Sequence, residues 1–179
     1  DATSGRVTRI AGLPEGWKSA ARYSPDGSRL LFAGREGRET WGVRNTLLFS
    51  CQLDGSDLQD LTGHTDFCLS STVLSDTAEA SFGAHYEFTG DGRHVLMCFG
   101  WHGASVIATV PLAGGSVRLL TSGPTSTVMG NLSADGRRIA VCTGNATTLP
   151  EVALAEIRGS RQLQKLALKP LTNFNGPLL

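Results

Sequence analysis

The chain has 179 residues, of which 40% are hydrophobic and 18% charged, values that suit a globular domain with a core of its own. Sixteen basic residues balance sixteen acidic ones, which excludes the strongly basic surface typical of a nucleic-acid-binding protein, so no nucleic acid is expected as a partner. No apolar run approaches the roughly 20 residues that span a bilayer, so no membrane partner is expected either.

The N-terminal stretch DATSGRVTRI has neither an initiator methionine nor a signal-peptide pattern, which indicates a processed product or an excised fragment. Within it, VTRIAG resembles VRLLTS at residues 117–122, the end of a unit that recurs along the chain. We therefore expect residues 5–12 to form the closing strand of a unit that precedes the first complete one.

The recurring unit begins with ARYSPDGSRLLFAG, which returns with changes as HYEFTGDGRHVLMCFG and as GNLSADGRRIAVCTG. Each copy places Asp-Gly between two apolar segments, one of the strongest short signals for a β-hairpin. Asp and Gly suit the turn because both tolerate a left-handed backbone conformation. The apolar runs that follow the turns hardly alternate, so both faces of these second strands are expected to be covered.

Two more strands complete each unit. The third is expected at 46–53, 105–112 and 151–157, and the fourth ends in Leu-Thr at 61–62, 120–121 and 171–172. Four short antiparallel strands in a period of about 50 residues are typical of a β-propeller blade. The sequence predicts an all-β fold: a partial β-propeller domain over residues 1–179, with about three four-stranded antiparallel blades at approximately 18–62, 83–121 and 127–173. An open sandwich is the alternative.

Propellers close with four to eight blades, so three blades predict further blades in the intact protein. Strand order places the Asp-Gly hairpins on one face and the longer connections, such as 34–44 and 63–83, on the other. Because function usually resides in irregular loops on a rigid scaffold, substrate or partner contacts are expected on the face of the longer loops.

Candidate binding residues fall into three groups, and an ordinary surface or structural role is the alternative for each. The arginines of the loop 34–44 can bind a carboxylate as guanidinium forks: Arg35, Arg38 and Arg44. Three histidines lie in loops of the same face or begin an inner strand: His64, His85 and His102. One repeat position on the innermost, channel-lining strands is polar in every copy: Arg22, Glu87 and Asn131.

No motif for catalysis or for binding a cofactor is present. The sequence has no G-x-S-x-G, H-E-x-x-H, Walker or Rossmann pattern, so no catalytic residue, metal ligand or cofactor is assigned to it. The four cysteines have no metal-binding spacing. Cys98 and Cys142 share a repeat position with Ala33, which predicts a small buried site there.

The phrases YSPDGSRLLFAG and LLFSCQLDGSDLQDLT resemble the WD-like propeller repeats of prolyl oligopeptidase-family serine peptidases, a repeat shared by the Tol-system periplasmic propeller. The closing segment, TLPEVALAEI followed by LKPLTNFNGPLL, is similar to the one that precedes the hydrolase domain in acylaminoacyl-peptidase-type members. The matching residues are Pro150-Glu151-Val152 and Leu171-Thr172-Asn173-Phe174-Asn175. The resemblance covers nearly the whole chain.

This resemblance implies an α/β-hydrolase domain after Leu179 that carries a Ser-Asp-His triad, none of which can be placed in this chain. The chain alone would be inactive and would gate and position peptide substrates, with the remaining blades and the hydrolase domain as partners. A homo-oligomer is compatible with it, and the cytoplasm is the expected compartment. The alternative is a non-enzymatic Tol-type propeller that binds proteins or peptides in the periplasm.

Overall fold

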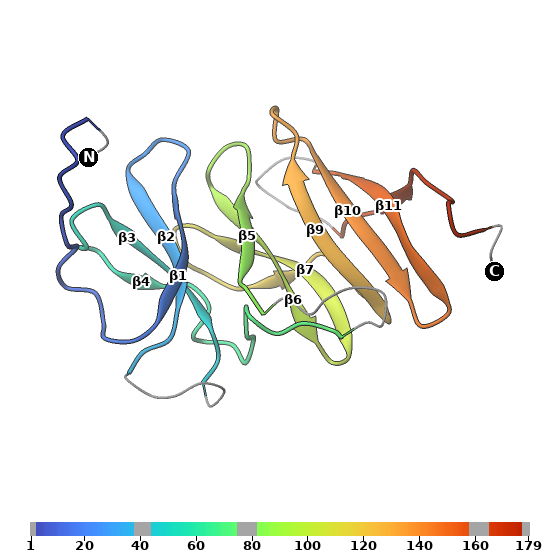
Figure 1. Cartoon of the computed structure of the whole chain (residues 1–179), viewed down its shortest axis with the longest axis horizontal. Coiled ribbons are helices and arrows are strands. Elements are labelled where there is room, and N and C mark those ends of the chain that lie inside the picture. Colours follow the sequence, from blue (N-terminus) through green and yellow to red (C-terminus); the bar gives the residue numbers. More distant parts are fainter. Residues whose placement is uncertain (1–2, 38–43, 75–81, 158–164, 177–179) are drawn as a thin grey trace.

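The computed structural model describes residues 3–37, 44–74, 82–157 and 165–176, which fold into three separate four-stranded antiparallel sheets. The sheets follow one another along the long axis of the molecule (Figure 1), and we call them blades 1, 2 and 3. Blade 1 consists of β1 (Lys18–Tyr23), β2 (Arg29–Gly34), β3 (Leu47–Gln52) and β4 (Gln59–Asp60). Blade 2 consists of β5 (His85–Phe88), β6 (His94–Trp101), β7 (Ala104–Pro111) and β8 (Arg118–Leu119). Blade 3 consists of β9 (Thr125–Leu132), β10 (Arg138–Asn145), β11 (Thr148–Glu156) and β12 (Lys169–Pro170).

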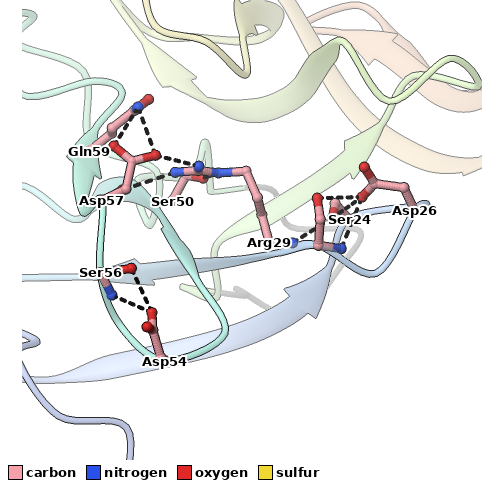
Figure 2. Close-up of polar contacts among 9 residues, drawn as sticks. Ser24, Asp26, Arg29, Ser50, Asp54, Ser56, Asp57 and Gln59 are labelled. Carbon is pink, nitrogen blue, oxygen red and sulfur yellow. Dashed lines mark hydrogen bonds and ion pairs between the residues drawn. The ribbon is translucent and has the colours of Figure 1, made fainter.

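The Asp-Gly hairpins predicted from the sequence are confirmed, and the structure explains why each begins with Ser or Thr. In blade 1 the Ser24 hydroxyl donates to the Asp26 carboxylate at 2.6 Å and accepts the Arg29 amide at 2.9 Å. Figure 2 shows these two contacts of Ser24. Gly27 takes a φ of +71°, which a side chain would strain. The same hydroxyl–carboxylate pair recurs in the other two blades, as Thr89 with Asp91 and Ser133 with Asp135.

Neighbouring blades pack face to face. We call the face of a blade that points toward the next blade in sequence its forward face, and the other its backward face. Alternate residues along a strand belong to opposite faces, as the pleat requires. One core joins the forward face of blade 1 to the backward face of blade 2, and includes Leu31, Ala33, Leu48, Val95 and Met97. A second core joins blades 2 and 3 in the same way, and includes Leu96, Ile107, Ile139 and Val141.

The Leu-Thr pair of each unit lies immediately after the outermost strand, and its threonine is bonded to the third strand. The Thr62 hydroxyl accepts the backbone amide of Leu48 at 2.9 Å, and Thr121 accepts that of Ile107 at 2.8 Å. Thr172 repeats the contact with Val152 at 2.9 Å. A two-residue strand forms few ladder bonds, so this side-chain bond extends the pairing of each outer strand.

Residues 5–12 form no strand within the described residues 3–37. Ile10 and Ala11 lie instead against the turn between β3 and β4, where a Cβ on Gly55 would meet the Ala11 carbonyl oxygen and the Ile10 side chain. A little further along, Leu13 packs on the backward face of blade 1, against the cluster of Phe32, Phe49 and Cys51. The expectation that residues 5–12 close an earlier blade stays a prediction.

The repeat position shared by Ala33, Cys98 and Cys142 is buried only where another blade covers it. Ala33 is fully buried and Cys98 is partly buried between blades 2 and 3, where burial raises the pKa of its thiol. The expectation of a buried site is wrong for Cys142, which is exposed. Cys142 lies on the forward face of blade 3, and none of the described residues packs on that face as a following blade.

Candidate binding site on the inner strands

The polar position of the inner strands brings Arg22, Glu87 and Asn131 together. They line an open hollow of about 510 Å³ to which all three blades contribute. Tyr23 and Phe88 add aromatic surface to its wall. The Asp-Gly turns of the blades supply the rim: Pro25, Gly90, Ser133, Ala134 and Gly136. The hollow therefore lies at the hairpin face, opposite the longer loops.

Irregular backbone in two of the three inner strands positions these side chains. The register between β1 and β2 shifts between Ser19 and Arg22, and the register between β9 and β10 shifts between Met129 and Leu132. In each case the inner strand carries one extra residue, a β-bulge, which changes where the following side chain points. Strand β5 pairs with β6 without a shift. Arg22 and Asn131 thus come from bulged strands and Glu87 from a regular one.

Arg22 and Glu87 form an ion pair across the boundary between blades 1 and 2. Arg22 Nη2 lies 3.2 Å from Glu87 Oε1, and the two side chains are 47% and 20% exposed. The remaining guanidinium N–H groups have no hydrogen-bond partner among the described residues. Asn131, which is exposed, forms no side-chain hydrogen bond within that part of the chain either. The hollow therefore offers several donors and one carboxylate, with one positive and one negative charge.

His85 begins β5, two residues before Glu87, and is half-buried. Burial lowers its pKa because the charged imidazolium loses hydration, Glu87 opposes that shift, and Arg22 adds to it. Its imidazole is therefore neutral at neutral pH. It adds no charge to the ion pair beside it.

Of the predicted arginine group, the structure describes Arg35 and Arg44, and carboxylate binding by this group stays a prediction. Arg35 Nε donates to the Thr46 hydroxyl at 3.1 Å, and its guanidinium carbon lies 5.5 Å from the ring centre of Trp17. These contacts hold Arg35 in a structural role. Arg44 donates to the Glu36 carbonyl at 3.3 Å. Arg38 lies outside the described residues.

The other two histidines are not among the residues that line the hollow. His64 is exposed in the connection that follows β4. His102 is in the turn between β6 and β7, where it adopts a φ of +49° and stacks on Trp101 with ring centres 4.3 Å apart. Trp101 in turn meets Phe67 edge to face at 4.6 Å. The position of His102 is that of a turn residue supported by an aromatic neighbour.

A second cavity lies on the face of the longer loops, between blades 2 and 3. It measures about 550 Å³, and the described residues that line it include no charged side chain. The lining comes from connections and strand ends of blades 2 and 3 and from the segment before β5, and includes Val73, Leu74, Gly103, Pro124, Thr148 and Leu149. Loop length pointed to this face in the sequence, but no residue type in these loops identified the lining, because apolar and hydroxyl side chains are common in any loop.

A polar cluster around Arg29, at the start of β2 in blade 1, has a structural role. Arg29 donates through Nη1 to Asp57 at 2.6 Å and through Nε to the Ser50 hydroxyl at 2.7 Å, as Figure 2 shows. These bonds tie β2 to β3 and to the turn before β4.

Among the described residues, no group of three His, Cys, Asp or Glu side chains is placed to hold a metal ion. That part of the chain also has no helix long and apolar enough to cross a membrane.

Comparison with solved structures identifies the fold. The chain is similar to TolB from Acinetobacter baumannii, with a TM-score of 0.57 and 22% identity, over 86% of this chain and 32% of that one. It is similar to a putative TolB from Agrobacterium tumefaciens, with a TM-score of 0.54 and 17% identity, over 88% and 50% of the two chains. The β-propeller domain of the Trilobed protease from Pyrococcus furiosus gives a TM-score of 0.55 and 16% identity, over 86% and 37%.

The chain is an all-β, β-propeller fragment of three blades. That conclusion rests on the three consecutive four-stranded sheets and on their likeness to these structures. The chain spans between a third and a half of the length of the three structures. No family model matches the sequence, and no curated protein sequence matches it. At such low identity the likeness concerns the fold alone.

Proposed function

We propose that this chain is the non-catalytic propeller part of a larger serine peptidase of the prolyl oligopeptidase family, similar to the acylaminoacyl peptidases. In this proposal it gates and positions peptide substrates for a separate α/β-hydrolase domain. The sequence resemblance in the closing segment carries the choice of family. The likeness of the fold to the propeller domain of a protease supports it.

The forward face of blade 3 supports the proposal that the intact protein is larger. Leu61 of blade 1 and Leu120 of blade 2 are both 1% exposed, because the following blade covers them. Leu171 occupies the same repeat position in blade 3 and is 55% exposed. The neighbouring positions of that face are also open: Val128, Ala140 and Cys142. An apolar sheet face of this kind fits the backward face of a further blade.

The two cavities described above are the places where a propeller could contact a peptide. The described lining of the cavity on the loop face is uncharged and suits apolar side chains, and the hollow on the hairpin face carries the ion pair. Hydrolysis itself would occur elsewhere, through attack by a serine with a histidine as general base.

The decisive experiment compares this chain with the polypeptide that contains it. We expect the longer polypeptide to hydrolyse short peptides, free or N-acylated, in a reaction that a serine-directed phosphonate blocks, and the chain of residues 1–179 to show no turnover. Labelling with a thiol reagent tests the open face in the same samples. Cys142 should react quickly in the chain alone and at least tenfold more slowly where a further blade covers it. A longer polypeptide without hydrolase activity would contradict the proposal.

A second candidate is a non-enzymatic Tol-type propeller that binds proteins or peptides. Its support is the likeness to two TolB structures and the shared repeat phrase. It also favours a periplasmic location over the cytoplasmic one expected from the sequence. A polypeptide that ends without a hydrolase domain, binds a protein partner and hydrolyses no peptide would favour this second candidate.

A further inference from the structure

We infer that the hollow lined by Arg22, Glu87 and Asn131 binds an uncharged, extended peptide segment through its backbone amide groups. This inference deepens the proposed function, and rests on it for the class of ligand. It places a peptide contact on the hairpin face, at the inner strands, whereas the sequence pointed to the longer loops.

The ion pair selects against ligands that carry a net charge. A carboxylate drawn to Arg22 would also approach the Glu87 carboxylate, whose oxygen is 3.2 Å from the guanidinium. An ammonium group drawn to Glu87 would meet the guanidinium for the same reason. Because both charges occupy one partly exposed site, the field of one largely cancels that of the other for a distant ion. An ionic ligand therefore gains little there.

A peptide amide matches both members of the pair at once. Its carbonyl oxygen can accept a hydrogen bond from the unpaired guanidinium N–H groups of Arg22. Its N–H can donate a hydrogen bond to a carboxylate oxygen of Glu87, which keeps free lone pairs beside the ion pair. Hydrogen bonds to charged partners are about twice as strong as bonds between neutral groups. The exposed Asn131 amide supplies a further donor and acceptor for a neighbouring peptide group.

The size and the aromatic wall favour a segment of several residues over a single small amide. A volume of about 510 Å³ is in the range of pockets that bind drug-sized ligands, which a few residues of a peptide match in size. Tyr23 is 67% exposed, and Phe88 beside it is half-buried. These rings present apolar faces on which an aliphatic or prolyl side chain of the peptide can pack. Each of the three inner strands supplies one polar side chain to the hollow.

The framework around the hollow is held in place before any ligand arrives. The turns of blades 2 and 3 touch at Gly90 and Gly136, where a Cβ on Gly136 would clash with the Gly90 backbone. Pro25 packs against Gly92 at the boundary between blades 1 and 2. A rigid rim lowers the ordering cost of binding.

The test measures binding of short peptides to the chain by isothermal titration calorimetry. The probe is a tetrapeptide of alanine and proline blocked by N-acetyl and C-amide groups, and its analogues carry a free amine or a free carboxylate. We expect the blocked probe to bind best. The substitutions Arg22→Gln and Glu87→Gln should each weaken it at least about tenfold, the factor that corresponds to one hydrogen bond to a charged group. Arg137→Gln, on an exposed turn residue that does not line the hollow, is the matched control.

Tyr23→Ala is a third hollow variant that is expected to fold normally, because the Tyr23 side chain is largely exposed and its removal leaves the core intact. It should weaken the probe about tenfold and leave the unfolding midpoint within 1 °C, roughly what a surface substitution does. Equal affinity of the wild-type chain and all three hollow variants would overturn the inference, as would tighter binding of the charged analogues. Peptide hydrolysis by the longer polypeptide without probe binding by this chain would overturn the inference alone. Binding here without hydrolysis there would overturn the proposed function alone.

Discussion

The Tyr86 hydroxyl of blade 2 donates a hydrogen bond to the backbone carbonyl of Ala20 in blade 1. Ala20 adopts a φ of +53° in the bulge of β1, a conformation that costs a non-glycine residue roughly 1–2 kcal/mol. Tyr86 is 1% exposed, and burial raises the pKa of its phenol, so the group stays protonated and remains a donor. A residue of blade 2 thus supports the strained backbone of the preceding blade, two residues before Arg22.

Tyr86→Phe should lower the free energy of unfolding by about 1 kcal/mol, because the ring still fills the core while the Ala20 carbonyl loses its donor. Urea denaturation followed by circular dichroism measures the change. Tyr23→Phe is the control, since the Tyr23 side chain is largely exposed and forms no hydrogen bond in the described residues. Equal effects of the two substitutions would show that the Tyr86 hydroxyl does not support the bulge.

Gly136→Ala and Gly27→Ala separate backbone strain from contact between blades. The two glycines occupy the same turn position, with φ of +66° and +71°, so both substitutions carry the cost of a left-handed alanine, about 1 kcal/mol. Only Gly136 faces the Gly90 backbone, whereas nothing lies within 4 Å of a Cβ on Gly27. We expect Gly136→Ala to cost at least about 1 kcal/mol more in thermal unfolding. A smaller cost at Gly136 than at Gly27 would contradict the tight contact of the turns.

Thr62→Val tests the bond that fastens an outer strand. Thr62 is fully buried, and its hydroxyl accepts the Leu48 amide, which valine cannot do. An unpaired buried amide costs about 1–3 kcal/mol, so denaturant unfolding should reveal a loss of that size. Thr62→Ser keeps the acceptor and should recover most of the difference. Hydrogen exchange at the Leu48 amide should accelerate in the valine variant but not in the serine variant.

The Asp26 hairpin should make stability depend on pH in the acid range. The pKa of Asp26 falls from an ordinary 3.8 to about 2, first because the Ser24 hydroxyl donates to it and then because the Ser28 amide and hydroxyl do. A carboxylate with a lowered pKa stabilises the fold above the unfolded value, and that contribution is lost as pH falls from about 4 to about 2. Asp26→Asn should remove this part of the pH dependence, and Ser24→Ala should raise the pKa toward its ordinary value. Carbon-13 NMR titration of the carboxylates measures it; an Asp26 pKa near 3.8 in the folded chain would refute the assignment.

The repeat was readable from the sequence because its signals are local. Asp26 and Gly27 mark a hairpin by their own backbone preferences. Side chains alternate between the two faces of a strand with a period of two residues, so the face to which each residue of β6 belongs follows from its position in the sequence. Arg22, Glu87 and Asn131 could be grouped because they share a repeat position. The bulges in the strands of Arg22 and Asn131 could not be predicted from the sequence. A bulge depends on the partner strand and on neighbouring blades, and no local sequence pattern records either of them.

The individual binding residues on the loops were the least predictable. Arg35 appeared as a free guanidinium in the sequence, but its contacts with Trp17 and Thr46 join segments far apart in the chain. Cys142 was expected to be buried because its repeat position holds Ala33 and Cys98 in the other blades, but only those two have a following blade beside them. In both cases the sequence identified the residue type and the repeat position, while burial and contact depended on long-range packing.

The forward and backward faces of a blade are different surfaces, and this gives the chain a direction. If the exposed forward face around Leu171 met the backward face of another molecule, the two partners would use different patches, and the contact would be heterologous. Such contacts have no two-fold axis, so they end only when the rotation between copies closes a ring, and otherwise they continue as an open filament. The angle between consecutive blades therefore decides whether self-association of this fragment would stop at a discrete ring or grow without limit.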